Sequence, residues 1–360
     1  MRIYFFLIMV AYLVGNIYIF IRALQTFSNF STGKKLLFSL IFWEIALAMV
    51  WPMIFRKTEM PLWLSQVLFQ VGSCWLLFTL YMVLALLVFD LSALFFSFKR
   101  RFQVAFGVTL CLLLYGYYNY KHPQVVEIPI ALENPLVYGE MKIVGISDVH
   151  LGMGTDKADL KKYVELINSQ QPDLILIGGD LIDNSLAPLY EQNMAEELAQ
   201  LRAPMGIYMV PGNHEYISGI KACEQFLKNT PIRLLRDTVI TLPNGIQLVG
   251  RDDRSKRRGR LALKELAAKR DSSCFSILMD HQPYELAQKD SLKFDLQFSG
   301  HTHHGQVWPM TMLIDRMYEQ SYGYRKWSHS HVYVSSGLSL WGPPFRIGTH
   351  SDLVVFVLSN

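Results

Sequence analysis

The fold is decided by residues 142–150, which read KIVGISDVH. The run from 142 to 147 is short and mostly apolar, which is typical of a strand that is buried on both faces. Asp148 and His150 follow it directly. Because they are two residues apart, an extended loop can turn both side chains the same way. The stretch therefore predicts a buried strand that carries an acid and an imidazole at its carboxyl end.

The same arrangement recurs four times along the chain, with a polar cluster directly after a predicted strand. The clusters are GGDLID at 178–183, GNHE at 212–215, DH at 280–281 and GHTHHG at 300–305. In open α/β sheets, ligands bind outside the carboxyl ends of strands, where the loops converge. Six of the ten histidines lie in the five clusters. This concentration favours one shared site over five unrelated loops.

The clusters contain seven oxygen and nitrogen donors, enough to hold two adjacent cations. They are Asp148, His150, Asp180, Asn213, His281, His301 and His303. Mixed imidazole and oxygen donors suit Mn, Fe or Zn, and no cysteine thiolate takes part. Two metal ions about 3.5–4 Å apart can activate a water and hold a phosphoryl group at once. Asp180 follows two glycines that let the backbone approach closely, so it is the natural bridging carboxylate.

The composition divides the chain into two unlike parts. Residues 1–119 hold nine of the 34 Lys and Arg and three of the 30 Asp and Glu. The remaining part therefore has 25 basic and 27 acidic residues. The positive charge belongs to the apolar part, so it does not indicate a nucleic-acid partner. The four cysteines are isolated, which argues against a thiolate zinc site.

Residues 1–119 are predicted to form a membrane region. A membrane helix needs about 20 apolar residues. About four runs meet this requirement, at about 3–21, 36–55, 62–96 and 102–118. The first and third loops carry six Lys or Arg against four on the other side. The positive-inside rule then puts these loops in the cytoplasm and the rest of the chain outside it.

Residues 120–360 are predicted to form a single α/β domain, because short apolar runs alternate with amphipathic ones. Residues 120–140 form a linker and a first strand. Further strands are expected at 142–147, 173–178, 206–210, 239–241, 246–250, 275–279, 295–298, 332–335 and 353–358. Helices are expected at 156–169, 191–202, 215–228 and 261–269.

Over roughly residues 140–358, the five clusters resemble the calcineurin-like metallophosphoesterase superfamily. The resemblance implies a sandwich of two mixed β-sheets flanked by helices, here preceded by the transmembrane helices. It also implies two divalent or trivalent metal ions as cofactors. The expected activity is metal-dependent hydrolysis of phosphoric ester or anhydride bonds.

Carried over to this sequence, the family's site gives each predicted ligand a place. One metal would be held by Asp148, His150 and His303, the other by Asn213, His281 and His301, with Asp180 as the bridge. His214 matches the histidine that contacts the phosphate and assists the leaving group, so it is the catalytic candidate.

Three further stretches are similar to the membrane-associated bacterial branch of the superfamily. They are LVGRDD at 248–253, YVSSG at 333–337 and WGPP at 341–344. Phosphoprotein phosphatases carry Arg-Gly directly after the acid equivalent to Asp183. Asn184 and Ser185 stand there instead, which counts against that class. Asp183 itself is expected to support the site from outside the ligand set.

Two residues are candidates for substrate contact. His304 stands where this branch usually has Gly, so its imidazole could contact the substrate or narrow the site. Arg254 begins the basic run 254–260, which is either a solvated loop or a contact for substrate or anionic lipid. Trp308 and Trp341 are expected in the core or at an interface rather than at a substrate.

We therefore predict a membrane-anchored, dinuclear-metal-dependent hydrolase of phosphodiester or phosphoanhydride bonds. The resemblance implies a bacterial inner membrane, and the count of basic residues in the loops places the catalytic domain outside the cytoplasm. Related membrane enzymes cleave UDP-diacylglucosamine, which implies a phosphorylated or lipid-linked small molecule as substrate and a role in lipid metabolism. A non-catalytic membrane scaffold with a metal-binding domain, a phosphoprotein phosphatase, and a transporter or channel with a regulatory domain stay open as alternatives.

Overall fold

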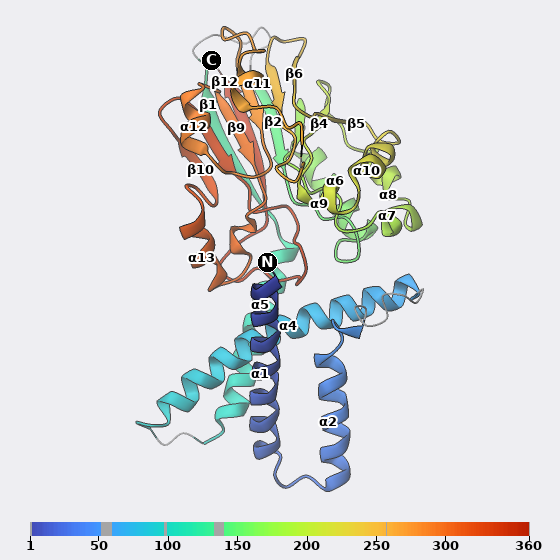
Figure 1. Cartoon of the computed structure of the whole chain (residues 1–360), viewed down its shortest axis with the longest axis vertical. Coiled ribbons are helices and arrows are strands. Elements are labelled where there is room, and N and C mark those ends of the chain that lie inside the picture. The colour runs from blue at the N-terminus through green and yellow to red at the C-terminus, as the bar shows by residue number, and fades with distance from the viewer. Residues whose placement is uncertain (1, 52–59, 97–98, 133–139, 257, 360) are drawn as a thin grey trace. The chain divides into compact units, whose positions relative to one another are not determined.

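The computed structural model describes residues 2–51, 60–96, 99–132, 140–256 and 258–359 (Figure 1). The chain forms two compact units. The first comprises Met1–Tyr118 with Gly342–Phe345, and the second comprises Asn119–Trp341 with Arg346–Asn360.

The first unit is helical. Its helices are α1 (Arg2–Thr26), α2 (Thr32–Ala46), α4 (Leu62–Ser92) and most of α5 (Arg101–Lys121). α1 packs against α4. Two side chains of α1 bind the Asp90 carboxylate near the end of α4. The Tyr18 hydroxyl donates to it at 2.6 Å and the Arg22 guanidinium at 2.5 Å. An apolar cluster of residues such as Ile19, Phe42 and Met82 joins α1, α2 and α4.

The prediction of about four membrane spans is corrected to two helices that qualify. Among the described residues, only α1, over Phe6–Thr26, and α4 are long and apolar enough to cross a membrane. α2 has 15 residues, fewer than the roughly 20 that a span needs. The second half of the predicted span 36–55 runs into residues 52–59, which lie outside the described part. α5 has 21 residues, but polar groups such as Gln103, Asn119 and Lys121 lower its hydropathy.

The second unit contains two six-stranded sheets. The first has the order β1 (Gln124–Ala131), β12 (Asp352–Ser359), β2 (Met141–Ile146), β3 (Leu174–Ile177), β4 (Ile207–Met209) and β5 (Ile232–Leu234). The second has the order β10 (Gly323–Lys326), β11 (His331–Val334), β9 (Leu296–Ser299), β8 (Ser276–Met279), β7 (Gln247–Gly250) and β6 (Thr238–Thr241). Both sheets are mixed: β2 to β5 run parallel while β12 runs antiparallel to β2, and β6 and β10 run antiparallel to the strands beside them.

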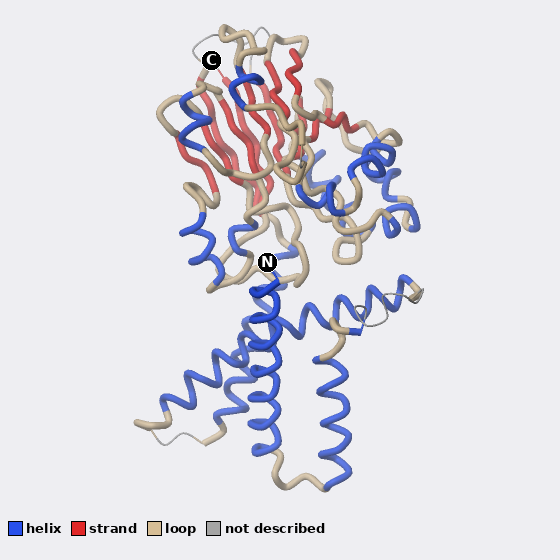
Figure 2. Tube along the Cα trace, viewed as in Figure 1, coloured by secondary structure: helices blue, strands red, loops and turns tan. Residues whose placement is uncertain are grey.

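The two sheets pack face to face, and helices cover the outer faces (Figure 2). Successive side chains of β2 point alternately to the two faces of the first sheet. Ile143 packs into the core between the sheets, whereas Val144 and Ile146 pack outward against α6 (Lys157–Ser169) and its neighbours. Outside the second sheet, Val249 and Leu278 pack against α11 (Leu263–Ala267) and Phe294. The expected fold class, an α/β sandwich of two mixed sheets flanked by helices, is confirmed.

Several predicted helices differ from those observed. The region 191–202 contains the end of α7 (Ala187–Glu191) and α8 (Met194–Leu198), because the chain turns at Asn193 in a left-handed conformation, φ +51°. The region 215–228 divides into α9 (Asn213–Ile217) and α10 (Ile220–Leu227) at Gly219, φ +97°. Four further elements were not predicted from the sequence, namely β5, β10, α12 (Leu286–Ser291) and α13 (Met310–Met317).

Candidate metal centre

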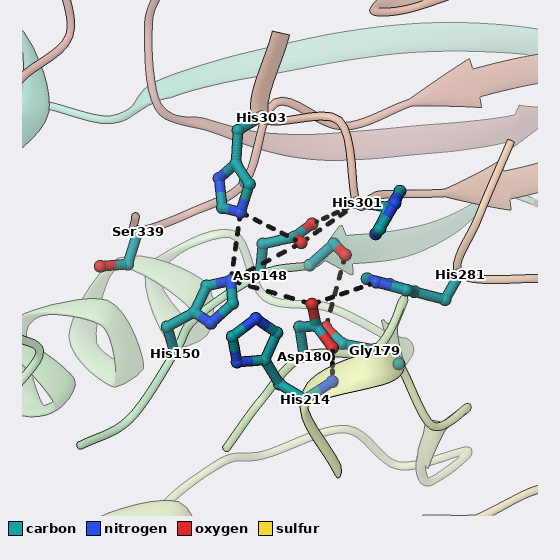
Figure 3. A network of polar contacts seen from close by, with 12 residues as sticks. Asp148, His150, Gly179, Asp180, His214, His281, His301, His303 and Ser339 are labelled. Atoms are coloured by element: carbon teal, nitrogen blue, oxygen red, sulfur yellow. Dashed lines mark hydrogen bonds and ion pairs between the residues drawn. The ribbon is translucent and has the colours of Figure 1, made fainter. Parts of the chain in front are cut away.

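The five polar clusters meet at one edge of the sandwich, at the carboxyl ends of strands from both sheets. β2, β3 and β4 of the first sheet lead into residues 147–150, 178–183 and 211–215. β8 and β9 of the second sheet lead into residues 280–281 and 300–305. Because these strands run parallel within each sheet, their loops leave on the same side. Segments far apart in sequence thereby share one site (Figure 3).

The first group of potential ligands is Asp148, His150 and His303, whose ligand atoms lie within 4.8 Å of one another. The Nε2 atoms of His150 and His303 are 3.1 Å apart, and His303 Nε2 is 3.5 Å from Asp148 Oδ1. Two imidazole nitrogens at this distance can share a proton or bind a common cation. Asp148 is held in place by the backbone N–H of His301, which donates to its carboxylate at 3.0 Å.

The second group is Asp180, His281 and His301, also within 4.8 Å. His281 Nε2 lies 3.1 Å from Asp180 Oδ2. The other ring nitrogen, Nδ1, is 2.8 Å from the carbonyl oxygen of Gly178 and donates its proton there. A second hydrogen bond of this kind sets the tautomer and the orientation of a metal-binding histidine, and it leaves Nε2 free to bind.

The residues present fit a pair of cations. Asp148 and Asp180 are both buried, with relative exposures of 0% and 2%. Buried carboxylates are costly unless a positive charge accompanies them. Asn213 Oδ1, at the start of α9, is buried and has no hydrogen-bond partner in the described part of the chain, so it has a lone pair to offer. This amide is the residue that the sequence predicts as the neutral oxygen ligand.

Two of the imidazoles are neutral at pH 7, the form that binds a metal ion. Burial lowers the pKa of His301 to about 4. Burial also lowers the pKa of His303 to about 3, although the nearby Asp148 opposes the shift.

Five of the seven predicted ligands have a left-handed backbone. They are Asp148, His150, Asp180, His301 and His303, with φ between +48° and +74°. This conformation is unfavourable for residues other than glycine, at about 1–2 kcal/mol each. Such strain persists where the surrounding structure holds it and concentrates at functional sites.

Glu215 joins two of the site's loops. Its carboxylate accepts hydrogen bonds from the backbone N–H groups of Gly212, Asp180 and Ile182, at 2.7, 3.0 and 2.9 Å. Burial beside Asp180 raises the pKa of Glu215 to about 7 despite these three donors. At Gly212 a side chain is excluded, because a Cβ atom would lie 2.1 Å from Asp180 Oδ1. Glu215 lies in the GNHE cluster, but its sequence context predicts no role for it.

Asp183 contacts two histidines of the site. Its Oδ1 lies 2.9 Å from His214 Nδ1 and 3.4 Å from His150 Nδ1, and the three residues form a third close group. Burial alone would raise the pKa of Asp183, but the contacts with both rings outweigh it and lower the pKa to about 2. Asp183 is therefore an anion in contact with His150, a predicted metal ligand, and His214, the predicted catalytic histidine.

Replacing Asp183 by Asn should reduce turnover roughly 10–100-fold, the usual effect of removing a group that orients a ligand. The asparagine keeps the shape and removes the charge that holds both rings. Metal content and turnover are the two measurements. Asp159→Asn, at a carboxylate on α6 that pairs with Lys121, is the matched control and should leave both unchanged. Wild-type turnover in Asp183→Asn would show that the contact has no role in the reaction.

The two candidate substrate contacts already have partners within the protein. The His304 ring stacks on Tyr322 at 4.8 Å, and its Nε2 lies 3.4 Å from Asp315 of α13. Arg254 lies over the Tyr284 ring at 4.7 Å, with its guanidinium 3.5 Å from Glu285.

The two tryptophans expected in the core or at an interface are not in the core. Trp308 is 49% exposed and Trp341 is 53% exposed. The Trp341 ring lies 6.1 Å from the His214 ring, centroid to centroid.

A buried arginine supports the site and was not anticipated from the sequence. Arg346 is fully buried, and its guanidinium donates to the carbonyl oxygens of His303, Ser336, Gly337 and Ser339. No local pattern marks it, because all four acceptors are backbone atoms that only the folded chain brings together.

Comparison with known proteins agrees with this geometry. Residues 141–305 match the family model of the calcineurin-like phosphoesterases. The chain is 35% identical to an uncharacterized metallophosphoesterase of Helicobacter pylori over 69% of this chain and 68% of that one. It is 29% identical to an uncharacterized metallophosphoesterase of Campylobacter jejuni over 99% and 98% of the two chains. A transmembrane protein with a metallophosphoesterase domain from Danio rerio is 30% identical over 72% and 63%. The chain thus belongs to the calcineurin-like phosphoesterases and is a metal-dependent phosphoesterase.

Proposed function

We propose that the protein is a membrane-anchored hydrolase of phosphodiester or phosphoanhydride bonds that uses two metal ions, with Mn, Fe or Zn as the best fit. The position of Asp180 carries this proposal. Its Oδ2 lies 3.1 Å from His281 Nε2 and 3.9 Å from His150 Nε2, one histidine of each ligand group. A single carboxylate is thereby placed to serve both cations. Bound metals would supply an activated water and offset the charge of the phosphoryl group.

His214 is proposed as the general acid. With Nδ1 facing the Asp183 carboxylate at 2.9 Å, Nε2 is the nitrogen that remains to hold a proton for the leaving oxygen. The Asp183 anion stabilises the protonated ring and fixes its orientation. The backbone N–H of His214 donates to Asp180 Oδ1 at 2.8 Å, so the acid and the proposed bridging carboxylate are held together.

Apolar side chains beside His214 support a lipid-linked substrate. Trp341 is half exposed next to the His214 ring. Ile217, three residues after His214 on α9, is 60% exposed. Exposed apolar groups beside a polar centre favour a substrate that joins a phosphate to an apolar chain.

Trp341→Ala should therefore lower kcat/KM about tenfold for a phosphodiester with a long acyl chain, because the lost apolar area no longer contacts the chain. For a nitrophenyl phosphodiester without a chain, the loss should be small. Steady-state kinetics on both substrates test this, with Trp308→Ala as a matched control for an exposed tryptophan. Equal losses on both substrates would remove the argument for a lipid-linked substrate.

The helices support membrane anchoring through α1 and α4. The C-terminal ends of these two helices lie together, since Arg22 and Asp90 are 2.5 Å apart. Arg22, Lys34, Lys35 and residues 99–101 gather the positive charge at that end, which the positive-inside rule assigns to the cytoplasm. α5 begins at this basic end, and its 21 residues are long enough to reach the other side of the membrane although it is less apolar than α1 and α4. We therefore propose that α5 also crosses and that the catalytic domain lies outside the cytoplasm. A reporter fused after Asn360 tests this topology.

Metal dependence tests the proposed reaction. We expect that the purified full chain hydrolyses a nitrophenyl phosphodiester and that a chelator abolishes this activity. Mn²⁺ should restore it more readily than Ca²⁺, because Ca²⁺ prefers oxygen ligands and this site is rich in imidazole. Metal content measured alongside the activity should approach two ions per chain. Full activity in metal-free protein would contradict the proposal.

A further inference from the structure

We propose that the helical unit binds one anionic phospholipid, with its phosphate in a basic cleft at the C-terminal ends of α1 and α4. The cleft has a volume of about 690 Å³. It is formed by the end of α1, the turn after α4 and the start of α5. This inference rests on the proposed membrane anchoring and is independent of the metal centre.

The charges around the cleft are unbalanced. Four of its lining residues are cations, namely Arg22, Lys99, Arg100 and Arg101, and none of its lining residues is acidic. Asp90 neutralises part of this charge, because its carboxylate contacts Arg22 at 2.5 Å and Arg101 at 3.1 Å. Within the described residues, Lys99 and Arg100 form no ion pair. The cleft therefore has room and charge for an anion.

Hydrogen bonds within the protein hold the Arg22 guanidinium in place. One terminal nitrogen donates to Asp90 and the other donates to Gln25 at 2.7 Å. Its Nε is buried and has no acceptor among the residues that the structure describes. A buried N–H without an acceptor is unfavourable, and a phosphate oxygen would satisfy it.

An apolar groove adjoins the basic cleft. It has a volume of about 740 Å³ and is lined by residues of α1, α2, α4 and α5. Phe102 and Gln103 line both the groove and the cleft, so the two adjoin at the start of α5. The groove follows α5 from Phe102 to Leu113, a rise of about 16 Å along a helix. This is close to half of a bilayer's hydrocarbon thickness of about 30 Å.

The adjoining cleft and groove select the occupant. A soluble phosphate would use the cations and leave the groove empty. A neutral or zwitterionic lipid would fill the groove and leave the excess positive charge uncompensated. An anionic phospholipid matches both parts, and basic pockets between membrane helices are known to take such headgroups.

Binding to the full chain in a neutral detergent tests the proposal. Native mass spectrometry would compare phosphatidylglycerol with phosphatidylcholine of the same acyl chains. We expect phosphatidylglycerol to bind at least tenfold more tightly. The double variant Lys99→Gln/Arg100→Gln should lose roughly 30-fold in affinity for phosphatidylglycerol and little for phosphatidylcholine. The control Lys34→Gln/Lys35→Gln removes the same charge from the start of α2, outside the cleft, and should bind as the wild type does.

Inorganic phosphate serves as the competitor. At millimolar concentration it should displace little phosphatidylglycerol, since it makes no contact with the groove. Effective displacement would identify a site for soluble anions and overturn the lipid assignment. Equal binding of both lipids, or equal losses in the two double variants, would also overturn it. Hydrolysis of a nitrophenyl phosphodiester should be unchanged in both variants, so failure of this inference is distinguishable from failure of the proposed function.

Discussion

Asp180→Ala is expected to empty the metal centre. Metal content should fall from two ions per chain toward none. Turnover should fall more than about 100-fold, which exceeds the usual effect of replacing a residue that only hydrogen-bonds to a metal ligand. The reason is its position between the two ligand groups, with Oδ2 within 3.1 Å of His281 Nε2 and 3.9 Å of His150 Nε2. Elemental analysis of the purified chain and steady-state turnover are the measurements.

Two further variants separate the charge of Asp180 from its shape. Asp180→Asn keeps an oxygen that can accept the His214 N–H, a bond of 2.8 Å in the protein, but loses the negative charge. We expect it to lose metal nearly as fully as the alanine variant. Asp159→Ala removes a carboxylate of the same domain away from the site and should keep both metals. Two tightly bound ions in Asp180→Ala would show that Asp180 is not the bridge.

His214→Ala should differ in kind, because this residue is assigned to the leaving group and not to a metal. The metals should stay bound while turnover falls roughly 10²–10⁴-fold, the usual contribution of a general acid. A leaving group of low pKa needs little proton donation. The loss should therefore be small on nitrophenyl esters and large on alkyl esters, which turnover of both substrates by wild type and variant would measure.

The control for this variant is His331→Ala, at a ring that contacts Tyr324 and lies outside the three close groups of the site. It should keep wild-type turnover on both esters. Equal losses on both esters in His214→Ala would leave the residue as a charge stabiliser and exclude the general-acid role. Loss of metal would instead make His214 a ligand.

Much of the catalytic domain was predictable because the signals are local. The strand at 142–147 is observed as β2, and its run of apolar residues marks it as buried. The motif residues could be located because each cluster follows a strand, and parallel strands send their loops to one edge. The structure indeed brings Asp148, His150 and His303 together, and likewise Asp180, His281 and His301.

Local patterns failed where a backbone conformation or a long-range contact decides the outcome. Helix 215–228 is interrupted because Gly219 adopts a positive φ, which the flanking helical pattern conceals. The strands β5 and β10 have three and four residues, too few for a periodic signal. The count of membrane spans failed for a different reason, since apolar composition does not reveal that α2 stops at 15 residues.

The α/β class, the ligand types and the separation of an apolar helical part from the catalytic part follow from the amino-acid sequence alone, because each depends on residues close together in the chain. Which groups touch is a property of the folded molecule. Folding inserts the C-terminal β12 between β1 and β2, sets Asp183 against both His150 and His214, and aims Arg346 at the carbonyl of His303. It also places a basic cleft beside an apolar groove in the helical unit. These contacts join residues far apart in sequence, and their geometry follows from strand order and loop conformation, which no local pattern encodes.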